Sequence, residues 1–265
     1  MKQLAQTIFH HRRVLLDLAI VDIRRRYLSS VLGLGWAFLR PLATFALYAV
    51  VFGAILRMKV PSDVYGSDSY GLFLIVALVP WFAIFEFIAR GSAVLFEQRD
   101  LVMRMAFPAE ALPIPYLLAA LFNHAIWIGL LLLFLRFSGM GWSAALIWAP
   151  VLVLLLAAMG LGILWFLAGV NVFLRDLGHF AEIGLNFAFF ATPIVYSLTS
   201  VPPAWRFLLM LNPFYYPIEA YRSVFLAQCS PPIHVLVGFS VVSLLFLFAG
   251  FRAFTALKPQ IPDYL

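Results

Sequence analysis

The chain has 265 residues, of which 64% are hydrophobic and only 11% are charged, and its net charge is +6 at pH 7. A soluble domain carries about 25% charged residues because its surface must be solvated, so this composition excludes an ordinary soluble protein. The positive charge needs no nucleic-acid partner, because an excess of Lys and Arg on one face of a membrane would produce it.

Residues 1–30 predict an amphipathic helix rather than a signal peptide. Charged residues interrupt the clean apolar stretch that a signal peptide requires. Leu4, Ile8, Leu15, Leu18 and Ala19 can share one helix face, with the arginines mostly elsewhere. This pattern is typical of a helix that lies in the membrane interface, and a cytosolic helix packed on a partner protein would show it too.

Six long apolar windows follow, each near or above the ~20 residues that a helix needs to cross ~30 Å of hydrocarbon. The apolar–polar alternation of membrane strands is absent, and backbone groups in lipid must be paired within their own segment. We therefore predict an all-α polytopic membrane protein, with residues 1–265 as a single transmembrane domain. The predicted spans are 31–56, 71–95, 112–137, 143–170, 181–199 and 232–255.

Lys and Arg are distributed unevenly between the two sides of these spans. If the N-terminus lies in the cytosol, thirteen of the 18 basic residues fall on the cytosolic side and five on the outer side. Basic residues are enriched in cytosolic loops of membrane proteins. Both termini are therefore predicted to be cytosolic.

The sequence offers no recognisable nucleotide or metal site. Lys2, Lys59 and Lys258 are its three lysines, and none follows a glycine, so the phosphate-binding loop GxxxxGK[ST] is absent. The single cysteine, Cys229, excludes an internal disulfide and a cysteine-based metal site, and we expect it to be buried as a small hydrophobe. We expect no catalytic residue, cofactor or metal in this chain.

Ionisable residues within the predicted spans could mark an ion or proton pathway. Glu86 and Arg90 lie four residues apart on the second span and can pair on one helix face. An ion pair between these two residues would argue against a proton relay. The chain also lacks two matched, Gly- or Pro-broken spans of the kind found in secondary transporters. An ion-coupled carrier is therefore the weaker interpretation.

Segment 96–111 is predicted to be cytosolic, yet it carries several apolar residues. A short amphipathic helix pressed on a partner protein would explain them, and so would a plain interfacial loop.

Segment 200–231 is too polar for another full span and too apolar for a solvated loop. Prolines divide it, so we expect two short helices around 203–211 and 214–228, with the break at residues 212–213. Such a hairpin would dip back into the outer leaflet as a lid over a pathway. Glu219 and Arg222 are three residues apart and can neutralise one another there.

Four blocks of the chain resemble, in order, segments of one known family. Residues 22–53, 78–114, 171–180 and 191–225 are similar to parts of the membrane subunit of type-2 ABC exporters for polysaccharides such as O-antigen, capsule and teichoic acid. They correspond to the start of the first span, the second span with its coupling helix, the turn between spans four and five, and the outer gate. The chain departs from the family at Ala109–Glu110, where a basic residue is expected.

The resemblance implies a transport subunit without its own ATPase site, in the bacterial inner membrane. Such a subunit pairs with a second copy of itself and with two copies of a separate ATP-binding subunit, which holds ATP and Mg. Its cargo would be an undecaprenyl-linked polysaccharide moved from cytosol to periplasm. Membrane lipids, and no nucleic acid, would be its other partners.

Three groups of candidate site residues follow from this resemblance. Contact with the ATP-binding subunit is expected at Glu97, Arg99, Asp100, Leu101, Met103 and Arg104. The lipid pyrophosphate, or alternatively lipid headgroups, would meet Arg24, Arg25, Arg26 and Arg40. Channel or gate positions are expected at Trp36, Phe38, Trp81, Phe85, Tyr215, Tyr216, Glu219, Tyr221 and Arg222. Flat rings can contact the C–H faces of sugars, although packing explains each aromatic residue equally well.

Three other functions stay open. One is an ABC permease that exports a small drug or lipid. Another is a purely structural subunit of a larger complex. The third is a membrane-embedded glycosyl- or acyltransferase acting on lipid-linked substrates. That enzyme would need acidic or histidine residues clustered at one membrane face, and Asp63 with Asp68 is only a weak candidate.

Overall fold

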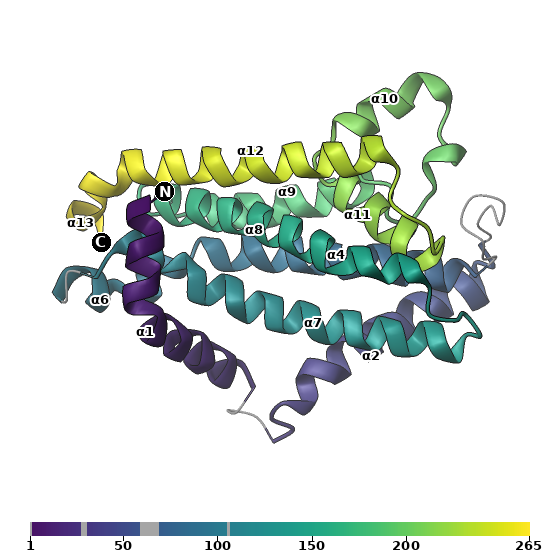
Figure 1. Cartoon of the computed structure of the whole chain (residues 1–265), viewed down its shortest axis with the longest axis horizontal. Helices are drawn as coiled ribbons and strands as arrows, with labels where there is room; N and C mark the ends of the chain where they lie inside the picture. Colours follow the sequence, from purple (N-terminus) through teal and green to yellow (C-terminus); the bar gives the residue numbers. More distant parts are fainter. Residues whose placement is uncertain (1, 28–30, 59–68, 105–106) are drawn as a thin grey trace.

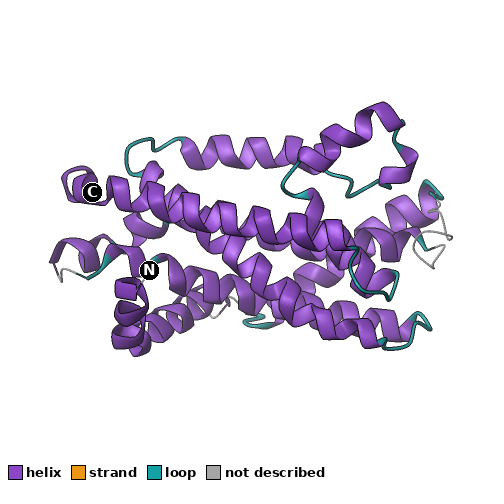
Figure 2. Cartoon of the chain, turned by 45° about the horizontal axis from the view of Figure 1, so that its top comes forward, coloured by secondary structure: helices purple, strands orange, loops and turns teal. Residues whose placement is uncertain are grey.

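The computed structural model describes residues 2–27, 31–58, 69–104 and 107–265, and every regular element in these ranges is helical (Figures 1 and 2). Within these described ranges, five helices are long and apolar enough to cross a membrane: Gly35–Ile55, Tyr70–Gly91, Ala109–Phe137, Ala144–Asn171 and Ile233–Tyr264. Both chain termini and α6 lie at one end of the bundle, which we call the terminal end (Figure 1). The predicted all-α polytopic membrane architecture is confirmed.

The elements follow one another as α-helices with short 3-10 and π-helical turns between them. The α-helices are α1 Lys2–Tyr27, α2 Gly35–Tyr48, α4 Tyr70–Gly91, α5 Val94–Glu97, α6 Arg99–Arg104, α7 Pro113–Phe137, α8 Ala149–Asn171, α9 Leu177–Ala191, α10 Pro203–Leu211, α11 Tyr215–Tyr221, α12 Ile233–Leu257 and α13 Ile261–Tyr264. The short turns are η1 Ala49–Ile55, η2 Ala109–Ala111, η3 Ala144–Trp148, η4 Leu198–Ser200, η5 Arg222–Leu226 and η6 Lys258–Gln260.

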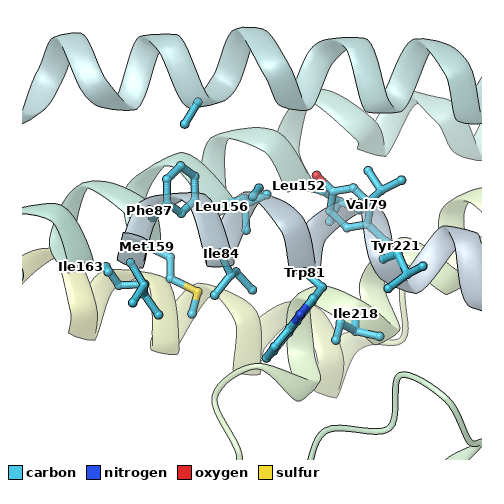
Figure 3. Packing of buried hydrophobic residues seen from close by; sticks show 14 of the residues in the cluster. Val79, Trp81, Ile84, Phe87, Leu152, Leu156, Met159, Ile163, Ile218 and Tyr221 are labelled. Carbon is cyan, nitrogen blue, oxygen red and sulfur yellow. The ribbon is translucent and has the colours of Figure 1, made fainter. Parts of the chain in front are cut away.

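Helix α4 forms the centre of the bundle, between α7, α8 and α11. Apart from Glu86 and Arg90 near its end, its sequence is apolar on all sides, as is typical of a helix surrounded by protein. Ile84 and Phe87 are fully buried, and they belong to the same core cluster as Leu156 and Met159 of α8 (Figure 3). Packing in this core, rather than contact with water, determines the position of α4.

Helices α8 and α12 approach each other through small residues. A Cβ atom on Gly162 would lie 2.1 Å from the Phe246 carbonyl oxygen, and one on Gly250 would lie 2.0 Å from the Gly162 carbonyl oxygen. Only glycine allows such close backbone contact, which is the usual way that membrane helices gain van der Waals packing. These two glycines therefore allow the backbones of α8 and α12 to pack in direct contact.

Helix α1 runs across the bundle rather than along it and packs on α7 and η2 (Figure 1). Leu15 and Ala19 are buried, while Ile8 and Leu18 are half-buried and packed against the core. The predicted apolar face is confirmed. The side chain of Leu4 lies outside the described residues, and the other members of this face pack on the chain itself.

The window 181–199 does not contain a helix long enough to be a full span. Helix α9 has 15 residues, and at 1.5 Å per residue it rises only about 22 Å, short of the ~30 Å hydrocarbon core. The helix ends because Thr192 is extended before Pro193, a position that disfavours helical backbone. The predicted count of six spans is thus not confirmed, and five windows contain helices of sufficient length.

The two short helices predicted in segment 200–231 are present. Helix α10 covers Pro203–Leu211, and α11 with η5 continues from Tyr215 to Leu226 after a break at Asn212–Pro213. Cys229 follows η5 in the loop before α12 and is exposed, so the expectation that it is buried was wrong. Loops run over protein surfaces, and the lone thiol lies on one of them.

Candidate functional site

A charged cluster joins α1, α4 and α7 near the terminal end of the bundle. On α1, Arg26 Nη2 lies 2.6 Å from Asp22 Oδ2, while Arg26 Nη1 donates to Glu86 Oε1 on α4. Asn123 Nδ2 on α7 donates to both Glu86 oxygens, at 2.9 and 3.1 Å. Tyr27 Oη donates to Asn123 Oδ1 at 2.7 Å. Glu86 is therefore held by donors from two other helices.

Arg90 extends the charged cluster toward segment 96–111. Its guanidinium pairs with Asp22 and lies 3.6 Å from Glu97 Oε2. The predicted pairing of Glu86 with Arg90 was wrong, since the structure pairs both residues with α1 instead. Sequence spacing permits the pair within α4, but α1 packs on the neighbouring helix α7, and its Arg26 and Asp22 form ion pairs with Glu86 and Arg90.

Tyr116 on α7 connects the end of α5 to the same region. Its hydroxyl donates to Glu97 Oε2 at 2.8 Å and accepts from Gln98 Nε2 at 3.2 Å, and its ring lies 4.9 Å from the Arg90 guanidinium. A continuous set of polar contacts thus runs from α1 through α4 and α7 to the first residues of segment 96–111.

The environment of Arg26 keeps its guanidinium charged. Burial alone would lower the pKa of Arg26, but the Glu86 and Asp22 carboxylates outweigh that effect and raise the pKa above its ordinary value. Because its charge is fixed, Arg26 acts as a permanent cation between two carboxylates.

A cavity of about 400 Å³ adjoins the charged cluster between α1, α2, α4 and α7. The lining that matters here is Arg26, Trp36, Arg40, Phe85, Glu86 and Asn123. Four of these, Arg26, Trp36, Arg40 and Phe85, were predicted as site residues from the sequence. Arg40 has no ion-pair partner within the part of the chain that the structure describes. The cavity therefore offers cationic and aromatic groups side by side.

Three other predicted residues, Arg24, Arg25 and Phe38, do not line this cavity. Arg24 and Arg25 are exposed on α1, whereas their neighbour Arg26 turns inward. Phe38 is exposed on α2. Asp22 and Asn123 belong to the charged cluster and were not predicted as site residues. The i,i+4 spacing of Asp22 and Arg26 was the available signal for Asp22.

The predicted partner-contact residues divide between the core and the surface. Leu101 packs against the core, whereas Arg99, Asp100 and Met103 are exposed. The side chain of Arg104 lies outside the described residues, as do Lys59, Asp63 and Asp68. Short α6 therefore has one packed and one exposed side.

Glu110, at the point where the chain departs from the family pattern, forms an ion pair with the C-terminal segment. Lys258 Nζ lies 2.6 Å from Glu110 Oε2, and Trp165 Nε1 donates to the Glu110 carbonyl oxygen at 2.9 Å. An acidic residue at position 110 is thus complemented by a basic residue of this same chain.

Arg222 organises the opposite end of the bundle. Its side chain is fully buried, and Nη1 and Nη2 donate to the carbonyl oxygens of Pro193 and Ile194 at 2.6 and 2.7 Å. The guanidinium lies 3.7 Å from the centre of the Phe73 ring. Glu219 Oε2 lies 3.7 Å from Nη1, so the predicted Glu219–Arg222 pair is confirmed. Arg222 satisfies carbonyl groups that the break after α9 would leave unpaired.

The remaining predicted gate residues lie mainly inside the chain. Trp81 and Tyr215 are buried, and Tyr216 lies beside Tyr215 with the ring centres 5.2 Å apart. Tyr221 is buried and its hydroxyl lies 2.7 Å from His124 Nε2. Packing within this chain accounts for these positions, which was the alternative left open for each of them.

The chain is similar to known proteins over most of its length. The family model described as ABC-2 type transporter matches residues 18–226. The O-antigen export system permease protein RfbA of Myxococcus xanthus is 27% identical over 265 residues, covering 99% of each chain. A Klebsiella pneumoniae protein of the same name is 26% identical over 270 residues, covering 95% of this chain and 96% of the relative. The polysialic acid transport protein KpsM of Escherichia coli is 25% identical over 228 residues, covering 83% of this chain and 84% of the relative.

Proposed function

Because the chain belongs to the ABC-2 type transporter family, we propose that it exports an undecaprenyl-linked polysaccharide from the cytosol to the periplasm. The chain is a permease subunit and works with a separate ATP-binding subunit. Its similarity to O-antigen export permeases extends over nearly its whole length, which supports a polysaccharide as cargo. The cavity beside the charged cluster is the observation that carries the finer proposal.

The lipid pyrophosphate is proposed to bind at Arg40 in this cavity. Arg26 and Arg90 are already paired with carboxylates, whereas Arg40 lines the cavity without such a partner among the described residues. A guanidinium binds phosphate oxygens through two parallel hydrogen bonds, so Arg40 suits a diphosphate. Trp36 and Phe85 would then contact the first sugars through their ring faces.

The exposed side of segment 96–111 is proposed to contact the ATP-binding subunit. Arg99, Asp100 and Met103 are exposed on that side, while Glu97 connects the segment to α4 and α7. Nucleotide-driven movement of the subunit would thereby reach the charged cluster and the cavity. The assembly would contain two copies of this chain and two ATP-binding subunits, the nucleotide and Mg being held by the latter.

The terminal end of the bundle is proposed to face the cytosol of a bacterial inner membrane. Both termini and α6 share this end, and the excess of Lys and Arg on the cytosolic side of the predicted spans supports that orientation (Figure 1). The segment 192–231 would then lie at the periplasmic face, where α10 and α11 would act as a lid over the exit.

Reconstitution tests the function directly. The chain and its ATP-binding subunit would be placed in proteoliposomes with a fluorescent undecaprenyl diphosphate-linked oligosaccharide. We expect ATP-dependent transfer of the glycan across the bilayer, and no transfer when either subunit is omitted. Equal transport of a small lipid without diphosphate or sugar would instead favour the drug or lipid permease. Glycosyl or acyl transfer by the chain alone would make it an enzyme.

A further inference from the structure

Asn171, the last residue of α8, connects the end of α4 to the start of α9. Its side chain is buried, with Nδ2 donating to the Ser92 carbonyl oxygen at 2.8 Å and Oδ1 accepting from the Gly178 backbone N–H at 3.3 Å. Ser92 follows α4 directly and precedes segment 96–111, while Gly178 lies in the first turn of α9. One amide thus bridges the helices that lead into segments 96–111 and 200–231.

Both groups that Asn171 binds lie at helix ends and have no partner within their own helix. The last carbonyl groups and the first N–H groups of a helix have no hydrogen-bond partner within that helix. Asp176, the N-cap of α9, makes no side-chain capping bond, so Asn171 supplies that bond from another helix. A carboxamide can donate and accept at once, whereas a carboxylate can only accept.

Gly178 packs directly on Ser92. A Cβ atom at Gly178 would lie 2.8 Å from Ser92 Oγ and 3.0 Å from Ser92 Cβ. Close-packed groups transmit displacement because there is no free space between them to absorb it. A shift of Ser92 would therefore move the start of α9.

Helix α9 packs on α4 and α8 along one side, where Ala181, Ala188 and Phe189 lie against the core. Leu185 is its one buried residue, while Phe180, Phe187 and Phe190 are exposed. Asn212 Nδ2 donates to the carbonyl oxygen of Ala191, the last residue of α9, at 3.2 Å. Helix α9 thus has a polar side-chain contact at each end, and the contact at the far end comes from segment 200–231.

We propose that Asn171 is a positioning residue that transmits movement of segment 96–111 through α9 to the outer helices α10 and α11. The inference rests on the proposed function, in which segment 96–111 receives the movement of the ATP-binding subunit. The inference adds the route of this movement, which runs from Ser92 through Asn171 to Gly178 and then along α9. This route does not pass through the charged cluster.

The first test compares Asn171→Ala with Asn186→Ala, a control at an exposed asparagine on α9. Each variant is co-purified with the ATP-binding subunit and reconstituted, and ATP hydrolysis and glycan transfer are both measured. We expect Asn171→Ala to hydrolyse ATP while transferring about 2- to 30-fold less glycan per ATP, the range typical of residues that carry coupling between sites. The control should keep the wild-type ratio. An unchanged ratio in Asn171→Ala would overturn the proposal, because a purely structural residue would lower both activities together.

A second pair of variants tests the same route if Asn171→Ala does not assemble with the ATP-binding subunit. Gly178→Ala places a methyl group against Ser92, and Ser92→Gly removes the atoms that it would strike. Gly178→Ala should lower the glycan-to-ATP ratio, and the double variant should restore it. Absence of a defect, or a defect that the double variant does not repair, would overturn the proposal.

A distance measurement separates this inference from the proposed function. In a Cys229→Ser background, spin labels at exposed Phe190 and Arg136 report the position of the outer end of α9 relative to α7. ATP binding should change this distance in the complex, and Asn171→Ala should reduce the change. If the wild-type complex transfers no glycan, the proposed function fails while this measurement still tests the route. An equal change in Asn171→Ala would refute it.

Discussion

Arg26 on α1 and Glu86 on α4 are 60 residues apart in the sequence and form an ion pair across two helices. Asp22 and Asn123 complete the coordination of the two side chains. This arrangement fixes the end of the crossing helix α1 against the centre of the bundle, beside the cavity proposed to bind the lipid pyrophosphate.

Removing the Glu86 carboxylate should loosen α1. Glu86→Ala leaves Arg26 and Asn123 without a shared acceptor, so we expect a loss of about 1.5–3 kcal/mol in the free energy of unfolding. Glu86→Gln should lose less, because its amide oxygen still accepts one of these bonds. Thermal unfolding of the purified chain in detergent measures the difference, with Glu182→Ala on the exposed face of α9 as the control. Equal unfolding midpoints for Glu86→Ala and Glu182→Ala would contradict the assigned role of Glu86.

Arg40→Gln should weaken binding of the lipid carrier without affecting stability. Loss of a charge-assisted contact of about 1.5–3 kcal/mol corresponds to roughly 10- to 150-fold weaker binding. Titration of undecaprenyl diphosphate into the detergent-purified complex provides the measurement. The control is Arg136→Gln, an exposed arginine near the end of α7. The pyrophosphate site lies elsewhere if the two variants bind the carrier equally well.

Arg222→Ala should destabilise the chain far more than Arg206→Ala. Both arginines donate to backbone carbonyls, but Arg222 is fully buried whereas Arg206 is partly exposed. Leaving the buried partners of Arg222 unsatisfied should cost about 3–5 kcal/mol, against roughly 1 kcal/mol at Arg206. Unfolding midpoints of the two variants measured side by side would show whether burial produces this difference.

Gly250→Ala should disrupt the contact between α8 and α12. The added Cβ atom would meet the Gly162 carbonyl oxygen at 2.0 Å, so the helices must separate, at a cost of about 1–3 kcal/mol or more. Gly129→Ala on α7 is the matched control, because its Cβ atom would meet nothing within 4 Å. At that site alanine should be neutral or stabilising, since it favours the helix by about 1 kcal/mol. A stable Gly250→Ala variant would show that the two helices can shift apart freely.

Features that depend on one segment at a time could be predicted from the amino-acid sequence. Long apolar runs predicted the membrane helices, because lipid requires each backbone group to be paired within its helix. Prolines and Asn212 placed the break between α10 and α11. The three-residue spacing of Glu219 and Arg222 predicted their ion pair, because such residues are neighbours on the surface of one helix.

The identity of facing helices, in contrast, is visible only in the folded bundle. Arg24, Arg25 and Arg26 are chemically identical in the sequence, yet Arg26 alone of the three pairs with Glu86, because α1 packs on α7 in one particular rotation about its axis. Glu86 and Arg90 could have paired along α4, and the positions of Asp22 and Arg26 prevented it. Glu86 and Arg90 are the charged residues of α4 and the rest of its sequence is apolar, so the sequence does not indicate which helices lie beside it. Contacts between helices depend on their relative position and rotation, and packing of the whole bundle sets both.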